Sequence, residues 1–439
     1  MDVLDRAQAL GAPWAPSMRS LPDGDADLAG VSLMELVRRF GTPAYVLDEA
    51  EVRRRCRAYR AALPNADIMY AAKAFLCRAM VSWVRSEGLG LDVCSGGELA
   101  LALASGFPAG RIVFHGNAKT PRELHEAVDA GVGRIVIDNL AEINHLAALI
   151  PAGHRQKVLI RVIPDIEAGA YAAIRTGGED QKFGLSMAGG SAAEAVHRVL
   201  DQRGLELAGL HCHLGSQISE VEPYELAART MVEQLARIRE TRGVALPELD
   251  LGGGHGIAYL HGEHGLDLGR FAATVRTTVE ERAVGLGLPV PRLIIEPGRA
   301  ISGPAGVSLY RVIAVKRGMR RTFVAVDGGM SDHPRTSLYG ARYATTMIGR
   351  VSTAGPREVT VVGHHCESGD TIAEDAPLPA DIRPGDVLAV AATGAYHHSM
   401  ASTYNLTCRP PVVAVAGGQA RLVVRREEQD DLMRRDVGL

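Results

Sequence analysis

The sequence is poor in cysteine, and its few thiols follow no recognisable motif. Only six cysteines occur in 439 residues, and no two of them form a CxxC pair. A disulfide scaffold or a zinc ribbon needs closely spaced cysteines, so both classes are excluded. The histidine doublets at 364–365 and 397–398 lack a third ligand at a fixed spacing, so we expect no metal site.

The sequence also lacks an excess of basic charge and a long apolar run. It has 48 Lys and Arg against 51 Asp and Glu, a formal net charge of -3. Without a basic field to hold a phosphate backbone, nucleic acid is not an expected partner. No apolar run reaches the roughly 18 residues of a membrane span, and the first residues lack the features of a signal peptide. We therefore expect a cytoplasmic protein that does not associate with membranes and whose ligand is a small molecule.

Aromatic residues make up only 5% of the chain, whereas glycine is abundant with 49 residues. Glycine allows the close backbone approaches that phosphate-binding loops require. A length of 439 residues with 46% hydrophobic composition favours two or three domains, or one large barrel with an addition.

Short β-branched runs alternate with helical stretches in the first two thirds of the chain. This alternation predicts parallel strands, and eight such repeats match a closed (β/α)8 barrel of the TIM type, whose active groups lie at the C-terminal strand ends. The expected strands are 67–74, 89–97, 111–117, 134–139, 157–164, 207–216, 248–254 and 292–299.

After residue 299 the long helical stretches stop, and alternating strands predict a second, mostly antiparallel β domain. The early segment 44–49 is expected to join its sheet. The predicted domains are therefore an N-terminal segment at 1–48, a barrel at 49–299 and a C-terminal β domain at 300–439. The expected C-terminal strands are 307–315, 323–329, 358–365, 386–396 and 411–427.

Lys73, in YAAKAF, lies at the predicted end of the first barrel strand. An isolated motif of this kind is more often a solvated strand-end lysine. The functional alternative is a Schiff-base lysine, desolvated by its apolar neighbours. A phosphate site and an acidic partner elsewhere in the barrel favour the second interpretation.

Both features occur at later strand ends. The run GGGHG (252–256) offers backbone N–H groups for a phosphate at a following helix N-terminus, although glycine clusters also make plain turns. Glu296 either forms a structural ion pair or faces a pyridine nitrogen, which would keep pyridoxal phosphate a strong electron sink. His213 and Ser216 add a flat ring and a hydroxyl. His213 alone would not indicate a cofactor site, and it does so only together with these other residues.

With these residues in view, the chain resembles the diaminopimelate decarboxylases, which belong to the fold-type III pyridoxal-phosphate group together with eukaryotic ornithine decarboxylase and alanine racemase. The similarity runs in one order over most of the chain. Its motifs are YAAKAF, SGGEL (95–99), HGNAKT (115–120), DQKFG (180–184), HLGSQ (213–217), LDLGGG (249–254), EPGR (296–299), DGGMSD with RTSLYG (327–340), CESGD (366–370) and GAY with SMASTYN (394–405). A family histidine segment is missing from the 166–178 loop, which reads EAGAYAAIRTGG at 167–178, so closure of this loop over the substrate is in doubt.

The resemblance implies an enzyme that removes CO2 from meso-2,6-diaminopimelate to give L-lysine, the last step of lysine biosynthesis. It also implies a homodimer with active sites shared between subunits. Lys73 would carry pyridoxal 5'-phosphate, and Cys366 of the other subunit would donate a proton, with Asp370 or His365 tuning its acidity. The other implied cofactor residues are His213, Ser216, Gly253, Gly254, Glu296, Gly298, Arg299 and Tyr396, and the substrate residues are Arg299, Arg335, Tyr339, Glu367 and Tyr396.

Three alternatives remain at this point. A related decarboxylase of secondary metabolism would act on another amino acid, but a substrate without a distal carboxylate would leave Arg335 without a counter-charge. A racemase favours an arginine rather than Glu296 at the ring nitrogen. A non-catalytic pyridoxal-phosphate-binding barrel would leave the β domain, with its CESGD and GAY motifs, unexplained.

Overall fold

The computed structural model describes residues 8–166 and 182–438. The chain forms two compact units. The β unit comprises Met1–Arg54, Ile257–His264 and Arg299–Leu439, and the barrel unit comprises Arg55–Gly256 and Gly265–Gly298. The segment Ile257–His264 thus groups with the β unit although it follows the seventh predicted barrel strand.

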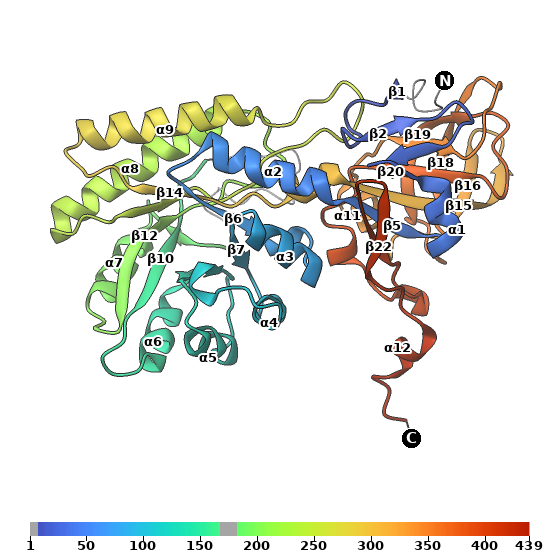
Figure 1. The fold of residues 1–439 in the computed structure, drawn as a ribbon. Coiled ribbons are helices and arrows are strands. Elements are labelled where there is room, and N and C mark those ends of the chain that lie inside the picture. The colour runs from blue at the N-terminus through green and yellow to red at the C-terminus, as the bar shows by residue number, and fades with distance from the viewer. Residues whose placement is uncertain (1–7, 167–181, 439) are drawn as a thin grey trace. The chain divides into compact units, whose positions relative to one another are not determined.

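Eight parallel strands close a barrel in the barrel unit (Figure 1), as the sequence predicts. Each strand pairs with the next, and closure comes from the pairing of β14 with β6 and of β9 with β10. A short strand, β11 (Leu185–Ser186), adds to β10. The barrel strands are β6 (Asp67–Ala71), β7 (Gly90–Val93), β8 (Ile112–Phe114), β9 (Arg134–Ile137), β10 (Gln156–Ile163), β12 (Leu205–His211), β13 (Glu248–Asp250) and β14 (Arg292–Ile295).

Apolar side chains that point inward from these strands fill the barrel, so its interior is a packed core and not a pore. Met69, Val113, Val136, Leu159, Ala208 and Ile294 form one buried cluster. Most strands end earlier than predicted. Thus β6 ends at Ala71, which places Lys73 in a 3-10 turn, η2 (Ala72–Ala74), and β13 ends at Asp250, ahead of the glycines. The polar residues of interest therefore lie in the loops just beyond the strand ends.

Helices connect consecutive barrel strands, and local capping explains several of their starts. In α5, Thr120 and Glu123 form a reciprocal capping box, Pro121 occupies the first turn and Gly131 ends the helix in the left-handed conformation. Side chains also cap α4 (Ser95), α6 (Asn139) and α9 (Asp267). The helices are α3 (Arg78–Ser86), α4 (Gly96–Ala104), α5 (Pro121–Ala130), α6 (Leu140–Leu149), α7 (Ser191–Leu200), α8 (Glu222–Arg242) and α9 (Leu268–Gly285), with η3 (Ala109–Arg111) before β8 and α2 (Glu49–Ala62) before β6.

The β unit contains a mostly antiparallel sheet, which confirms the second half of the fold prediction. The early strand β5 pairs with β15 and β21, so both ends of the chain build this sheet, as expected. Only β16–β18 and β5–β21 run parallel among the described pairs. The strands are β5 (Ala44–Asp48), β15 (Gly306–Arg317), β16 (Thr322–Val326), β17 (Thr345–Ile348), β18 (Pro356–Val362), β19 (Thr371–Pro379), β20 (Val387–Ala391), β21 (Val412–Ala416) and β22 (Gln419–Val424).

One strand prediction in this unit is wrong. The segment 411–427 is a hairpin of β21 and β22, because Gly417 and Gly418 both have positive φ and make the tight turn between them. The sequence also gave no indication of β17, β19 or a small N-terminal sheet. That sheet contains β1 (Gln8–Ala9), β2 (Met18–Ser20), β3 (Ala26–Leu28) and β4 (Val31–Ser32).

Short helices complete the β unit. They are α1 (Leu33–Phe40), α10 (Arg299–Ser302), α11 (Pro334–Tyr339) and α12 (Gln429–Met433), with the 3-10 turns η5 (Gly303–Ala305), η6 (His398–Met400) and η7 (Tyr404–Leu406). Throughout the described residues, every helix is too short or too polar to cross a lipid bilayer.

Candidate active site

Lys73 follows β6 in a turn that two hydrogen bonds hold in place. The Tyr70 hydroxyl donates to the carbonyl of Phe75, 2.8 Å away, and the N–H of Ala71 donates to the carbonyl of Pro297. Lys73 as a whole residue is exposed although Ala72 and Ala74 are buried, and the expected desolvation of its amine stays a prediction. Its charge acts on Asp92, Cys94 and His213, which places its amine among the polar groups at the strand ends.

A set of buried polar side chains, the barrel cluster, surrounds Glu296. The cluster comprises Asp92, His115, His211, Asp250 and Glu296. His115 Nε2 lies 2.6 Å from Glu296 Oε1, and His211 Nε2 lies 3.5 Å from Glu296 Oε2. Burial alone would raise the pKa of Glu296, but His115 and His211 hold it well below its usual range. Glu296 is therefore an ionised carboxylate inside the barrel.

The other two carboxyl groups of the barrel cluster behave differently. Burial raises the pKa of Asp92 to about 6, and burial with the nearby charge of Glu296 raises the pKa of Asp250 well above its ordinary value. Burial lowers the pKa of His211 to about 3, so this ring is neutral. At neutral pH Asp92 is therefore still mostly ionised beside Glu296, whereas the shift of Asp250 favours its protonated form.

Four of these side chains also have the donor types of a metal site. Ligand atoms of His115, His211, Asp250 and Glu296 lie within 4.8 Å of one another. The short contact between His115 and Glu296 and the raised pKa of Asp250 are those of a hydrogen-bonded charge network. The expectation of no metal remains a prediction.

The glycines after β13 pack so closely against neighbouring backbone that no Cβ would fit. A Cβ on Gly253 would lie 2.1 Å from the carbonyl oxygen of Glu296, and one on Gly254 would lie 2.2 Å from that of Gly215. Gly252 and Gly254 also have positive φ. A Cβ on Gly298 would lie 3.0 Å from the Cβ of Ala71. No helix follows the glycine run directly, contrary to expectation, because α9 begins only at Leu268.

His213 is oriented by this glycine loop. The N–H of Gly253 donates to His213 Nδ1 over 3.3 Å, which leaves Nε2 to carry the ring proton. Burial, then the charges of Lys73 and Arg161, lower the pKa of His213 well below its ordinary value, so the ring is neutral and flat. Ser216 is half-buried two residues before Ile218, whose N–H bonds to the carbonyl of Gly254. The predicted phosphate and ring residues of the barrel are therefore brought together.

A second group, made of four predicted residues and Tyr259, lies in the β unit and is called the arginine cluster. It comprises Tyr259, Arg299, Arg335, Tyr339 and Tyr396. Arg335 is 1% exposed, and its guanidinium carbon lies 5.7 Å from the Tyr339 ring centre and 5.8 Å from the Tyr396 ring centre. The guanidinium of Arg299 lies 4.6 Å from the Tyr396 ring centre. Cation–π contact of this kind stabilises a buried cation without neutralising its charge.

Cys366 and Glu367 lie in an exposed loop of the β unit. The loop is anchored by Asp370, whose carboxylate accepts the N–H groups of Met330 and His365 at 2.6 and 2.7 Å. Within the described residues neither Cys366 nor Glu367 makes a side-chain hydrogen bond. Asp370 therefore holds the loop by its backbone, and the structure gives no contact through which it would tune Cys366.

Sequence reasoning missed Asp92, His115, Arg161, His211, Asp250 and Tyr259. Arg161 and Asp92 each interrupt an apolar strand, and both are buried. A charged residue inside an apolar strand is costly unless it is paired, so this pattern was a usable signal. Arg161 lies 3.7 Å from Asp138 and 4.5 Å from the ring centre of Phe183. The histidines carried no signal of their own, because their partner Glu296 is distant in sequence.

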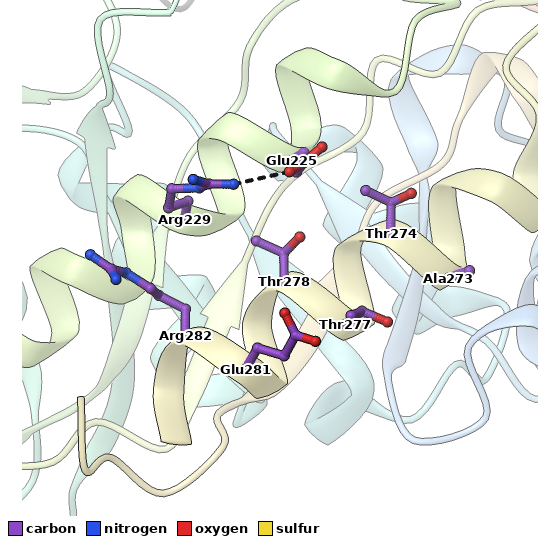
Figure 2. Close-up of a pocket in the computed structure, with 8 residues that line it drawn as sticks. All are labelled: Glu225, Arg229, Ala273, Thr274, Thr277, Thr278, Glu281 and Arg282. Carbon is purple, nitrogen blue, oxygen red and sulfur yellow. Dashed lines mark hydrogen bonds and ion pairs between the residues drawn. The ribbon is translucent and has the colours of Figure 1, made fainter. Parts of the chain in front are cut away.

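A groove between α8 and α9, with a volume of about 620 Å³, lies apart from these clusters. Figure 2 shows its lining of charged and threonine side chains, with Glu225 bonded to Arg229. All its lining residues come from the two helices, and none belongs to the barrel cluster. This groove is therefore not the candidate active site.

Comparison with known proteins agrees with the geometry. Residues 49–303 match the family model described as "Pyridoxal-dependent decarboxylase, pyridoxal binding domain". A diaminopimelate decarboxylase of Actinosynnema pretiosum subsp. auranticum is 55% identical over 417 residues, which cover 95% of this chain and 94% of the relative.

Solved structures give the same result. The diaminopimelate decarboxylase of M. jannaschii in co-complex with L-lysine is 30% identical, with a TM-score of 0.89 over 95% of this chain and 97% of its own. A lysine/ornithine decarboxylase from Vibrio vulnificus, complexed with cadaverine, is 25% identical, with a TM-score of 0.76 over 87% of this chain and 97% of its own.

Proposed function

Because the chain belongs to the diaminopimelate decarboxylase family of pyridoxal-dependent decarboxylases, we propose that its barrel cluster serves the cofactor and its arginine cluster selects the substrate. The enzyme converts meso-2,6-diaminopimelate to L-lysine and CO2, the last step of lysine biosynthesis. The residue roles below are our assignment.

The barrel residues fit pyridoxal phosphate. The glycine loop takes a close-packed course that only residues without a Cβ can follow, as phosphate-binding loops do, and an ionised carboxylate suits a protonated ring nitrogen. When bound, pyridoxal phosphate supplies an electron-poor ring that accepts the electron pair left behind as CO2 departs. Lys73 would hold the cofactor covalently and His213 would lie against its ring. Ser216, Gly253, Gly254, Gly298 and the backbone of Arg299 would bind its phosphate.

Each remaining residue has a role that its chemistry permits. Glu296 would keep a proton on the ring nitrogen, since His115 and His211 keep the carboxylate ionised. Arg299, Arg335 and Tyr339 would bind the distal carboxylate of the substrate. Cys366 would return a proton to the carbon that lost CO2, Glu367 would bind the distal ammonium, and Tyr396 would contact both cofactor and substrate.

The observation that carries the substrate assignment is the charge of Arg335. This cation is almost fully buried, and among the described residues it has no carboxylate partner. A buried charge without a counter-ion is costly, so an anionic ligand group is expected to complete it. A distal carboxylate is the group that distinguishes diaminopimelate from lysine and ornithine.

We also propose a homodimer with shared active sites, in which Cys366 and Glu367 act on the partner's cofactor. Their exposure on an anchored loop supports this assignment. Work in the cytoplasm, without a nucleic acid or membrane partner, is likewise part of the proposal and fits the balanced charge.

The test compares substrates. CO2 release should be followed with meso-diaminopimelate, L-lysine, L-ornithine and L-arginine under identical conditions. We expect kcat/KM to be at least about 100-fold higher for meso-diaminopimelate, the size of one lost charged contact. Comparable values for ornithine or lysine would instead favour a decarboxylase of secondary metabolism.

A further inference from the structure

The phenolic oxygen of Tyr259 accepts hydrogen bonds from both arginines of the arginine cluster. Arg299 Nη1 donates to it over 2.5 Å and Arg335 Nη1 over 3.0 Å. The two Nη1 atoms can be no farther apart than the sum of these distances. Two guanidiniums that close repel each other, so an acceptor between them is needed to hold the pair together.

Tyr259 itself is held rigidly. Its N–H donates to the carboxylate of Glu263 over 2.9 Å, and its carbonyl accepts the N–H of Ala344 over 3.0 Å. Its ring packs edge-on against Tyr343, with ring centres 4.9 Å apart, and only 4% of the residue is exposed. The backbone and the ring are therefore both fixed, and so is the position of the phenolic oxygen.

The charge state of this oxygen follows from its partners. Burial alone would raise the pKa of Tyr259, but the positive charges and hydrogen bonds of Arg299 and Arg335 lower it below its ordinary value. A phenolic oxygen has two lone pairs, and the two guanidiniums use both. Tyr259 thus occupies the position of a weak counter-ion between two cations.

We propose that Tyr259 is a positioning residue that holds Arg299 and Arg335 in convergence and thereby sets the preference for a substrate with a distal carboxylate. This inference rests on the proposed function of the two arginines. A carboxylate is a stronger acceptor than a phenol and can take one guanidinium on each oxygen. Because Tyr259 already holds the two guanidiniums close together, binding of the substrate carboxylate does not have to bring two like charges together.

The test is Tyr259→Phe, which removes the oxygen and keeps the ring. We expect KM for meso-diaminopimelate to rise by about 10-fold or more while kcat changes by less than about 3-fold, since the lost interaction precedes chemistry. The ratio of kcat/KM for meso-diaminopimelate to that for L-ornithine should fall by a similar factor. The matched control is Tyr45→Phe, which removes another buried, hydrogen-bonded hydroxyl of the β unit that bonds to the carbonyl of Asp332.

A binding measurement tests this inference without depending on catalytic turnover. Pimelate has two carboxylates and no amine, and hexanoate has one carboxylate. By calorimetry on the cofactor-loaded enzyme, wild type and Tyr45→Phe should bind pimelate more tightly than hexanoate, and Tyr259→Phe should lose most of that difference. Equal pimelate preference and equal KM in Tyr259→Phe and Tyr45→Phe would overturn the assignment.

A spectroscopic measurement covers the case in which Tyr259→Phe fails to fold. Saturating pimelate should shift the ultraviolet difference band of tyrosinate in wild type to higher pH, because the carboxylate takes over the positive charge that favours the phenolate. An unchanged band would count against the inference. If wild type prefers pimelate in this way but does not decarboxylate meso-diaminopimelate, the proposed function fails and the role of Tyr259 stands.

Discussion

The charged groups of the barrel cluster and of the arginine cluster are both buried, yet they are of opposite sign. In the barrel, histidines keep the Glu296 carboxylate ionised, and burial with the charge of Glu296 raises the pKa of the neighbouring Asp250 well above its ordinary value. In the β unit, Arg299 and Arg335 are surrounded by tyrosines, whose hydroxyls are weaker acceptors than carboxylates. The barrel cluster therefore presents a buried negative charge to a ligand, and the arginine cluster presents a buried positive charge.

This difference indicates what each cluster binds. A buried charge that the protein does not fully neutralise is stable only when a ligand completes it. The barrel carboxylate suits a cationic ring nitrogen, whereas the arginines suit an anionic substrate group. Each substitution below should therefore affect one kind of ligand and spare the other.

The largest effect is expected for Lys73→Ala, which removes the amine that we assign to the cofactor. The purified variant should lose the cofactor absorbance on dialysis and lose at least about 1000-fold in activity, because the covalent attachment is gone. Lys157→Ala, at an exposed barrel lysine with only a 4.0 Å contact to Glu206, is the control. A borohydride-reducible adduct that persists in Lys73→Ala would contradict the assignment.

Arg335→Ala tests the other cluster. It should cost about 2–5 kcal/mol in kcat/KM for meso-diaminopimelate, as expected when one partner of a buried charge pair is lost. L-lysine lacks the distal carboxylate, so its slow turnover should change little, and cofactor absorbance should be retained. Arg350→Ala, at an arginine already paired with Asp381 and Asp386, provides the comparison. Equal losses for both amino acids would mean that Arg335 does not read the distal group.

A mixing experiment tests whether Lys73 of one subunit and Cys366 of the other act in one shared site. Lys73→Ala and Cys366→Ala should each be inactive, and random reassortment should restore up to about a quarter of wild-type activity through hybrid dimers with one intact site. The activity is measured after subunit exchange has been demonstrated with labelled chains. If exchange occurs and the mixture stays inactive, each site is built within one subunit.

The sequence was sufficient to predict the barrel and the β sheet, because strand periodicity and turn residues are local signals. The residues at which the strands end were harder to predict from the sequence. The polar run after β12 was read as strand to residue 216, whereas pairing stops at His211. Local composition cannot indicate where a neighbouring strand stops offering hydrogen bonds. The hairpin at Gly417 and Gly418 was a local signal that was overlooked.

The residues of the site also divide into those that the sequence could predict and those that it could not. Lys73, Glu296 and the glycine run carry recognisable motifs, so their grouping was predictable. His115 opens the HGNAKT motif, but that motif assigned it no role, and Tyr259 lies in no motif. The importance of both comes from contacts with residues far away in sequence, Glu296 for the first and Arg299 with Arg335 for the second. Such pairings exist only in the folded chain.

The smallest expected effect concerns the histidine that supports Glu296. His115→Phe keeps a ring against His211, whose centre lies 4.8 Å away, but removes the nitrogen that contacts the carboxylate. The pKa of Glu296, now held low, should rise, so that the carboxyl takes up its proton at a higher pH. The acidic limb of kcat/KM should therefore move upward by about one pH unit, equivalent to about 1.4 kcal/mol of lost interaction.

The groups that face Glu296 share this titration, since Asp92, Asp250, His211 and Arg161 all interact with Glu296. The measured limb belongs to the barrel cluster as a whole, and activity should recover as the pH is raised above it. His255→Phe is the matched control, because His255 is a buried barrel histidine whose Nδ1 lies 2.7 Å from the Tyr59 hydroxyl and not beside a carboxylate. An identical pH profile for His115→Phe and His255→Phe would show that Glu296 stays ionised without His115. The negative charge of the barrel would then be set by His211 and the backbone alone.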